Sequence, residues 1–564
     1  MKIVIVGGVA GGASAAARLR RLDEGAQIIM LEQGEYISYA NCGLPYYVGG
    51  EITEKEALTL QTPESFHTRF RVDVRTRSRA QAIDTAAKTV TVQNLATGET
   101  YTEEYDKLIL SPGAEPLRPP FPGVDDERVF TLRSIPDTYR INDYVHQHNP
   151  KTAVVVGGGF IGLEMAENLT RAGLKVSVVE KADHLVATLD YDMACAVHRY
   201  ARSKGLDLYL GRGVTTFIPG EAGLAVGLDD GGCIQADMVI LSVGVRPESG
   251  LAKAAGLALN PRGAIVVNAH MQTSEQNVYA VGDAVEITNF VSGQPGYVPL
   301  AGPANKQGRI AADHICSLGS AYKGTQGSAI LKLFDMTVAA TGLTEEGAKA
   351  AGIEAEKAVT LSSSHAGYYP GAQNIRIKTV YEKGTGRILG AQLVGFDGVD
   401  KRCDVLATAI RAGMTAFDLT ELELCYAPPY SSAKDPVNML GYVIENILTG
   451  KVKQFHWHDV PQVLENPDAI LLDVRTVGEY RAGNIPGAVN IPLDDLRGRL
   501  GELPRDKVVY VHCQSGLRSY LACRILNQEG YDCYNLAGGY GFYETVIGES
   551  EYDERPCHPC GVKI

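Results

Sequence analysis

The chain contains the same strand, glycine-rich turn, helix and strand twice, at residues 2–32 and 151–180. In each copy an apolar strand enters a glycine turn, GGVAGG or GGGFIG, and the second strand ends on an acid, Glu32 or Glu180. Such a unit places a pyrophosphate at the helix N-terminus and a carboxylate beside the ribose hydroxyls. Two complete copies predict two dinucleotide sites on an α/β framework. The glycines that we expect at these sites are Gly7, Gly8, Gly11, Gly12, Gly157, Gly159 and Gly162.

Two later segments bring further glycines to the ends of apolar strands. YDKLILSPGAEP (105–116) ends its strand near Gly113, and TSEQNVYAVGDA (273–284) ends its strand at Gly282 and Asp283. A carboxylate beside a glycine turn suits the ribitol hydroxyls of FAD. We therefore expect both segments to complete the first dinucleotide site.

Length, charge and cysteine usage bound the class of protein. A chain of 564 residues predicts three or four domains, and a net charge of −13 argues against a nucleic-acid partner. The sequence holds no apolar run of about 18 residues, and its start, MKIVIVGG, is typical of a buried strand. We therefore expect no membrane partner and no secretory leader. Eleven scattered cysteines favour free thiols and a cytoplasmic location.

The order of these motifs resembles the pyridine nucleotide-disulfide oxidoreductase family of flavin enzymes. That resemblance implies FAD and NAD(P)H as cofactors, and a homodimer whose dimerisation domain shapes the partner's active site. Further on, DVR (473–475), AGNIPGAVNIP, CQSGLR (513–518) and LAGGY (536–540) are similar to the rhodanese family.

Together the resemblances predict an α/β chain with two Rossmann-like dinucleotide-binding domains, an α+β dimerisation domain and a C-terminal α/β rhodanese domain. The expected boundaries are 1–116 with 246–324 for FAD, 117–245 for NAD(P)H, 325–450 for dimerisation, 451–460 for a linker, 461–550 for rhodanese and 551–564 for a tail.

Cys42, in the segment SYANCGLPYY, is the expected redox centre. A solitary cysteine is ordinarily a small buried apolar residue. These flanks, however, resemble the single-cysteine branch of the flavin family, which includes coenzyme A-disulfide reductases, persulfide reductases, NADH oxidases and peroxidases. In that branch the cysteine lies against the flavin, and in the coenzyme A-handling group it pairs with an outside thiol.

The same resemblance implies that two tyrosines, Tyr368 in HAGYYPG and Tyr426 in CYAPPY, reach the partner's cysteine. A phenol there could stabilise a thiolate or donate a proton to a leaving thiol. Tyr369 is the competing assignment for the first tyrosine, and aromatic packing is the alternative for both.

A coenzyme A substrate would also need phosphate contacts, for which arginine is the preferred side chain. Ser38 and Asn41 match residues near the coenzyme A thiol arm in the family. The expected phosphate-binding residues, for which an exposed basic face is the alternative, are Arg18, Arg21, Thr62, Arg69 and Arg71.

Glu180 favours NADH because a carboxylate repels a 2′-phosphate, although the adjacent Lys181 leaves NADPH open.

Cys513 begins the loop CQSGLR between an apolar strand and a helix. Backbone N–H groups, the helix N-terminus and Arg518 would all favour a thiolate or a persulfide there. The loop resembles the sulfur-binding loops of rhodanese domains rather than the longer phosphate-binding loops of phosphatases.

Cys557 and Cys560 form a C-x-x-C pair, but no second pair completes a zinc site, so we expect no metal.

The presence of Cys42 and Cys513 in one chain predicts an enzyme that uses NADH to reduce sulfur–sulfur bonds in coenzyme A persulfide, polysulfide or coenzyme A disulfide. Cys513 would deliver or accept sulfane sulfur. One alternative is a coenzyme A-disulfide reductase proper, or an NADH oxidase or peroxidase that cycles through sulfenic acid. Others are a sulfurtransferase whose flavin part only regenerates thiols, and a non-catalytic redox sensor.

Overall fold

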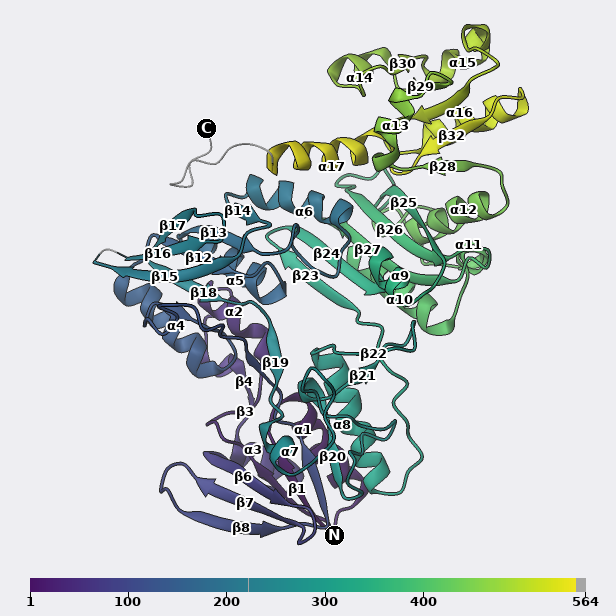
Figure 1. The fold of residues 1–564 in the computed structure, drawn as a ribbon. Coiled ribbons are helices and arrows are strands. Elements are labelled where there is room, and N and C mark those ends of the chain that lie inside the picture. The colour runs from purple at the N-terminus through teal and green to yellow at the C-terminus, as the bar shows by residue number, and fades with distance from the viewer. Residues whose placement is uncertain (222, 554–564) are drawn as a thin grey trace. The chain divides into compact units, whose positions relative to one another are not determined.

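The computed structural model describes residues 1–221 and 223–553. The described chain forms two compact units, residues 1–182 with 206–327, and residues 183–205 with the chain from Ser328 onward (Figure 1). Within these residues, no helix has both the length and the apolar character needed to cross a membrane.

The first glycine pattern lies at the centre of a parallel sheet in the first unit. In sheet order its strands are β20 (Val278–Ala280), β9 (Lys107–Leu110), β1 (Lys2–Val6), β2 (Gln27–Leu31) and β5 (Val72–Arg75). Successive residues of β1 enter different cores, Ile3 and Ile5 on one face and Val4 on the other. Helices α1 (Ala10–Leu22) and α8 (Ala301–Ile315) pack together on the Ile3 face. Burial on both faces explains why the strands are almost entirely apolar.

The second glycine pattern forms another five-stranded parallel sheet in the same unit. Its strands are β11 (Val129–Phe130), β18 (Met238–Leu241), β12 (Thr152–Val156), β13 (Lys175–Glu180) and β14 (Asp207–Leu210). This sheet falls between β9 and β20 in the chain, so the second dinucleotide unit is inserted into the first. The chain leaves along β10 (Ala114–Pro116) and returns along β19 (Val245–Pro247), and these two strands pair with each other. Helices α2 (Leu44–Val48), α4 (Ile135–His148) and α5 (Phe160–Arg171) pack together.

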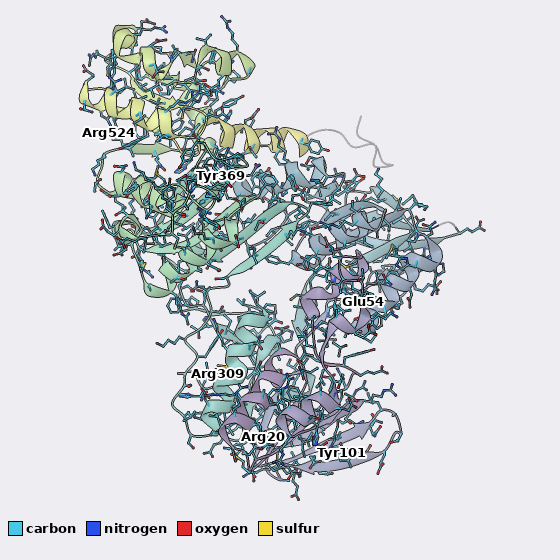
Figure 2. The ribbon with its side chains drawn as sticks, turned by 180° about the vertical axis from the view of Figure 1, so that it is seen from behind. Arg20, Glu54, Tyr101, Arg309, Tyr369 and Arg524 are labelled. Carbon is cyan, nitrogen blue, oxygen red and sulfur yellow. The ribbon has the colours of Figure 1, made fainter. Side chains whose placement is uncertain are left out.

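Small antiparallel elements complete the first unit. Two are strand pairs: β3 (Ile37–Tyr39) with β4 (Thr59–Gln61), and β21 (Ile287–Thr288) with β22 (Pro295–Gly296). Two are three-stranded sheets: β6 (Ser78–Asp84), β7 (Thr89–Asn94), β8 (Thr100–Glu104), and β15 (Val214–Gly220), β16 (Gly223–Leu228), β17 (Cys233–Ala236). Arg20, in the last turn of α1 and labelled in Figure 2, is buried and donates to five backbone carbonyls, including that of Phe70. Its guanidinium thereby connects α1 to the end of α3 (Pro63–Phe70).

The second unit contains an antiparallel sheet and a parallel sheet. The antiparallel sheet has the order β23 (Ala329–Leu333), β24 (Met336–Gly342), β27 (Ile388–Gly395), β26 (Asn374–Glu382), β25 (Ala355–Ser363), with helices α9 (Glu345–Ala350), α10 (Val399–Ala412), α11 (Ala416–Glu421) and α12 (Pro436–Leu448). The parallel sheet has the order β28 (Lys453–Phe455), β32 (Cys533–Leu536), β31 (Val508–His512), β29 (Ala469–Asp473), β30 (Val489–Asn490). Its helices are α13 (Val460–Glu465), α14 (Val477–Ala482), α15 (Leu493–Arg499), α16 (Leu517–Gln528) and α17 (Gly539–Asp553).

Two segments differ from their predicted places. Residues 451–460 were expected to be a linker, but β28 pairs with β32 and forms the edge of the parallel sheet, because Phe455 is buried in its core. Helix α6 (Tyr191–Ser203), expected within the NAD(P)H-binding domain, belongs to the second unit. It is held there by Asp192, which bonds Lys378 on β26.

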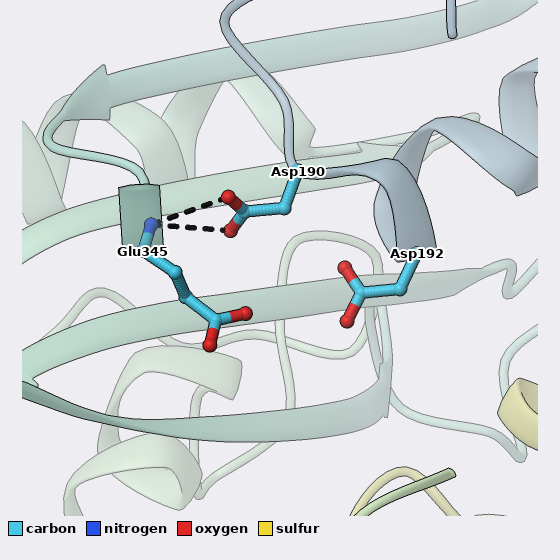
Figure 3. Close-up of side chains that lie close together, drawn as sticks. All are labelled: Asp190, Asp192 and Glu345. Atoms are coloured by element: carbon cyan, nitrogen blue, oxygen red, sulfur yellow. Dashed lines mark hydrogen bonds between the residues drawn. The ribbon is translucent and has the colours of Figure 1, made fainter. Parts of the chain in front are cut away.

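Lys378 lies at the centre of an acidic cluster that joins α6 to the antiparallel sheet. Figure 3 shows Asp190, Asp192 and Glu345, whose carboxylate oxygens lie within 4.8 Å of one another. The Lys378 ammonium is fully buried at 2.6 Å from Asp192, 3.0 Å from Asp190 and 2.5 Å from Glu345. Burial opposes its charge, but the three acids together raise the pKa of Lys378. The ammonium therefore supplies the positive charge that these acids require.

Replacing Lys378 by methionine should destabilise the second unit by about 3–5 kcal/mol, because the variant leaves buried carboxylates without a counter-charge. Trp457 is the sole tryptophan of the chain, and its Nε1–H donates to Asp192 at 3.4 Å, so its fluorescence reports on this cluster during urea unfolding. The loss should shrink as the pH falls through the carboxyl range, since protonation removes the unpaired charges. Lys383→Met, at an exposed position just after β26, is the control and should shift the transition little. Equal transitions for the two variants would contradict this role.

Candidate active site

The first glycine turn is shaped so that only glycine fits at its two ends. Gly7 has φ +97°, and a Cβ there would lie 2.0 Å from the carbonyl oxygen of Ser111. A Cβ on Gly12 would lie 2.0 Å from the oxygen of Gly7, so α1 can begin directly against the turn. Glu32 accepts from the N–H groups of Gly8 at 2.9 Å and Gly34 at 2.7 Å. A carboxylate has about four acceptor positions, so Glu32 can still accept from ribose hydroxyls.

The second glycine turn repeats this construction. Cβ atoms on Gly157 and Gly162 would lie 2.3 and 1.9 Å from backbone oxygens, and Glu180 accepts from the N–H groups of Gly158 at 2.6 Å and Ala182 at 2.7 Å. At Gly159, directly before α5, a Cβ would meet nothing within 4 Å, so this position faces open space at the helix N-terminus. Both turns thus fit the pyrophosphate and ribose of a dinucleotide.

Arg133 and Asp283 form an ion pair that the sequence did not predict. The Arg133 Nη2 lies 3.1 Å from the Asp283 carboxylate. A Cβ on Gly113 would lie 2.9 Å from that same nitrogen, so the glycine leaves room for the arginine. The N–H of Gly282 donates to Gln307 at 2.7 Å and fixes the turn that carries Asp283. Arg133 lies outside every motif, and nothing in its sequence context marks it.

Cys42 lies in a one-turn helix, Asn41–Gly43, between β3 and α2, and its side chain is exposed. Partial burial raises the pKa of the Cys42 thiol, and Glu164 and Asp283 raise it further, whereas Arg133 lowers it. Asn41 is the first residue of this turn, and Ser38 lies in β3 just before it. Ser38 has φ +43°, and its N–H donates to the oxygen of Gly8 at 2.8 Å. The strand that leads to Cys42 is therefore hydrogen-bonded to the first glycine turn.

Glu164 of α5 is a second acid that the sequence did not single out. Burial and the nearby Glu167 raise the pKa of Glu164 to about 7, although a hydrogen bond with Tyr46 opposes this shift. The (i, i+3) spacing of the two acids in LEMAEN places them on one helix face. That spacing is the signal by which the pair could have been found.

Glu164→Gln should lower the pKa of the Cys42 thiol, because it removes a negative charge that is present above about pH 7. Alkylation of Cys42 by iodoacetamide at pH 8, followed by peptide mass spectrometry, should be about threefold faster than in the unmodified protein. Glu54→Gln is the matched control: Glu54, labelled in Figure 2, is exposed and is not among the charges that act on Cys42. An unchanged or slower rate in Glu164→Gln would contradict this electrostatic assignment.

The predicted phosphate-binding residues have mixed surroundings. Arg18 pairs with the buried Asp313 at 2.7 Å, so its charge is shared within the first unit. Thr62 caps α3 by accepting from the N–H of Ser65 at 3.1 Å, and Arg71, at the C-terminal cap, pairs with Glu24 at 3.3 Å. The two remaining members are exposed and are Arg21 and Arg69.

Tyr368 and Tyr426 meet on the second unit. Their hydroxyl groups are 2.9 Å apart, and the side chains are 76% and 48% exposed. The hydrogen bond raises the pKa of the Tyr368 phenol. Both residues therefore present polar tips at a surface instead of filling a core.

The loop after β31 holds Cys513 as predicted from its spacing. The Cys513 Sγ is buried and accepts from the N–H of Gly516 at 3.2 Å and the hydroxyl of Ser519 at 3.3 Å. Arg518 makes a bidentate pair with Glu479 at 2.6 and 2.8 Å, and this pair lowers the pKa of Glu479 to about 2. The positive charge that the sequence assigned to the thiol is therefore shared with Glu479.

Residues of the DVR and LAGGY motifs pack against the Cys513 loop and hydrogen-bond its backbone. Arg475 is buried, bonds Asp473 at 2.7 Å and lies 3.9 Å from the centroid of the Tyr540 ring. The N–H of Tyr540 donates to the oxygen of Cys513 at 2.7 Å. A Cβ on Gly539 would lie 2.6 Å from that oxygen, which explains the second glycine of LAGGY. Cys557 and Cys560 lie outside the described residues.

Three stretches of the chain match models of known protein families. The family model for pyridine nucleotide-disulphide oxidoreductases matches residues 1–308, that for their dimerisation domain residues 328–436, and that for rhodanese-like domains residues 457–544. The chain is 36% identical over 442 residues to a coenzyme A disulfide reductase of Staphylococcus haemolyticus, covering 78% of this chain and 98% of that one.

Two solved structures resemble nearly the whole chain. The reduced CoADR-RHD of Bacillus anthracis is 51% identical with a TM-score of 0.95, covering 97% of this chain and 98% of that chain. A NAD-dependent persulfide reductase from A. fulgidus is 38% identical with a TM-score of 0.90, covering 96% and 100%. The chain is therefore an enzyme of the pyridine nucleotide-disulphide oxidoreductase family that carries a rhodanese-like domain after its dimerisation domain.

Proposed function

We propose that the chain uses NADH and FAD to reduce sulfur–sulfur bonds in coenzyme A persulfide, polysulfide or coenzyme A disulfide. The observation that carries the proposal is the pairing of two separate thiol sites in one chain. Cys42 lies exposed in a turn that follows β3, and β3 is hydrogen-bonded to the first glycine turn through Ser38. Cys513 lies in a loop of hydrogen-bond donors. The names of the two relatives with a similar whole-chain fold support the same chemistry.

The two glycine turns supply the cofactor contacts in this proposal. The first turn with Glu32 and Asp283 would hold FAD, and the second with Glu180 would hold NADH, whose ribose hydroxyls suit a carboxylate. FAD supplies the two-electron transfer from NADH to the sulfur of Cys42. Val9 occupies the middle position of the first fingerprint, where the second has Gly159, so the two sites differ at that position.

Cys42 then acts as the nucleophile. Its thiolate attacks the carbon-bound sulfur of a persulfide R–S–SH, forms Cys42–S–S–R and expels hydrosulfide. Two electrons and one proton return the Cys42 thiolate and the thiol RSH, so that one NADH yields one sulfide. Glu164, with a pKa of about 7, can carry a proton near this sulfur at neutral pH. Ser38, Asn41, Arg21 and Arg69 are the proposed contacts to the coenzyme A part.

A homodimer is the proposed assembly, because the dimerisation domain carries Tyr368 and Tyr426 at its surface. Their linked hydroxyls would face the partner's Cys42 and hold the leaving thiolate by hydrogen bonds. We propose the cytoplasm as the location, where a thiol-based cycle would stay reduced.

Cys513 is the proposed sulfane-sulfur carrier. Donors from Gly516 and Ser519 already point at its Sγ, as the anionic outer sulfur of a persulfide would require. The same donors favour a sulfurtransferase as the second candidate function.

Two sets of assays with the FAD-loaded enzyme separate these candidates: anaerobic assays with each sulfur substrate, and assays in aerated buffer without a sulfur substrate. NADH oxidation should occur with coenzyme A persulfide and release sulfide, and oxygen uptake without a sulfur substrate should be slow. Fast oxygen uptake with no sulfide release would instead indicate an NADH oxidase. Sulfite release from thiosulfate without NADH oxidation on any substrate would indicate a sulfurtransferase.

A further inference from the structure

A cavity of about 310 Å³ lies in the second unit where three distant segments of the chain meet. It lies between α6, β26 and α17, and Figure 1 shows α17 running alongside α6. The residues that line it are Ala196, Arg199, Tyr200, Ser203, Arg376 and Thr545. The lining therefore contains two cations and no acid.

Arg376 differs from two buried arginines of this unit because it has no carboxylate partner among the described residues. Arg402 and Arg475 are buried and pair with carboxylates at 2.9 and 2.7 Å. For Arg376 and Arg199, no carboxylate oxygen of the described residues lies within 4.0 Å. Arg376 instead donates to the Thr545 hydroxyl at 3.4 Å and lies 5.1 Å from the centroid of the Phe542 ring.

Among the described residues, the charge on Arg376 is consequently not paired with a carboxylate. Burial lowers the pKa of its guanidinium to about 10, and Arg199 contributes to that lowering, although Cys195 and Asp192 oppose it. Asp192 is already bonded to Lys378 at 2.6 Å. An anion in the cavity would supply the missing charge.

We propose that this cavity binds a tetrahedral oxyanion, a phosphate or a sulfate-type group, between the guanidinium groups of Arg376 and Arg199. Guanidinium offers a planar fork of donors that matches two oxygens of such an anion. The hydroxyls of Ser203 and Thr545 already donate to the backbone oxygens of Tyr200 and Gly541. The two arginines therefore supply the hydrogen-bond donors that bind the anion. A cavity of about 310 Å³ can also admit an oxyanion that is part of a small organic molecule.

The oxyanion would also stabilise the position of α17, the helix that hydrogen-bonds the backbone of the Cys513 loop. Near the start of α17, Tyr540 and Gly541 donate to the oxygens of Cys513 at 2.7 Å and Gln514 at 3.0 Å. Thr545, which lines the cavity, is one turn further along the same helix and bonds Gly541 at 2.7 Å. The site thus connects α6 and β26 to the backbone behind the sulfur-carrying thiol.

Calorimetric titration of the FAD-loaded enzyme with inorganic phosphate, and separately with sulfate, tests the proposal at constant ionic strength set by chloride. R376Q should weaken the response by about tenfold or more, since it removes charge-assisted hydrogen bonds. R497Q, which removes an exposed arginine of α15, is the charge-matched control and should leave the titration unchanged. Sulfate is used because thiosulfate could react with Cys513.

The two anions identify the source of the ligand. Binding of both supports a general oxyanion site, phosphate alone supports a phosphate ester, and sulfate alone supports a sulfur oxyanion. Should R376Q not fold, R199Q, at an exposed position, replaces it with the same expectation. The proposal is overturned if neither anion binds, or if the arginine variant and R497Q give the same titration as the unmodified enzyme.

Discussion

Cys42→Ser should abolish NADH-dependent cleavage of sulfur–sulfur bonds, with a loss of at least about 10⁴-fold in kcat. Serine keeps the shape of the exposed turn Asn41–Gly43, but its hydroxyl cannot form the mixed disulfide on which turnover depends. FAD binding should persist, because the glycine turns and Glu32 are unchanged. The measurement is the rate of anaerobic NADH oxidation with coenzyme A persulfide at saturating concentration, together with the flavin absorbance.

A matched variant separates this effect from general thiol loss. Cys425→Ser removes another exposed thiol, in the second unit, and should retain nearly full activity. If Cys42→Ser keeps full activity, or if the two variants lose it equally, Cys42 is not the nucleophile.

Cys513→Ser should abolish transfer of the outer sulfur of thiosulfate. In that step the Cys513 thiolate attacks the outer sulfur, forms Cys513–S–S⁻ and releases sulfite. The Gly516 N–H and the Ser519 hydroxyl donate hydrogen bonds to the Cys513 sulfur. A serine oxygen cannot carry sulfane sulfur, so sulfite release should fall at least about 10³-fold. Reduction of preformed coenzyme A persulfide should continue, because it needs only Cys42.

Both activities should be measured on the same preparation. Cys233→Ser, which alters a cysteine of the first unit outside both sites, is the control and should change neither activity. Loss of both activities in Cys513→Ser would favour the sulfurtransferase alternative, in which every substrate passes through Cys513.

Features that follow from local backbone geometry could be predicted from the sequence. The apolar strand at the start of the first glycine unit matches β1, and the strand in YDKLILSPGAEP matches β9. The glycine turns were predictable because Gly7, Gly12 and Gly157 lie where a side chain would collide with backbone. The donors around the Cys513 sulfur were predictable because Gly516 and Ser519 follow Cys513 closely in the sequence.

Features that depend on packing between distant segments could not be predicted. Arg133 and Glu164 act on Cys42 but come from other parts of the chain, and their surroundings exist only after folding. The helix after the glycine turn GGVAGG begins inside that turn, at Ala10, because Gly12 allows α1 to pack against the backbone of Gly7. Arg518 was expected to act on the thiol, but its geometry also satisfies Glu479, which lies 39 residues earlier.

Intact-protein mass spectrometry tests the central claim most directly, namely that the other half of the Cys42 disulfide arrives with the substrate. The NADH-reduced enzyme, freed of NADH, is mixed anaerobically with one equivalent of coenzyme A disulfide per chain and then quenched in acid. We expect one coenzyme A moiety on each chain, located on Cys42, removed by added NADH and absent in Cys42→Ser. An enzyme that oxidises NADH with this substrate yet never carries coenzyme A on Cys42 would contradict the account.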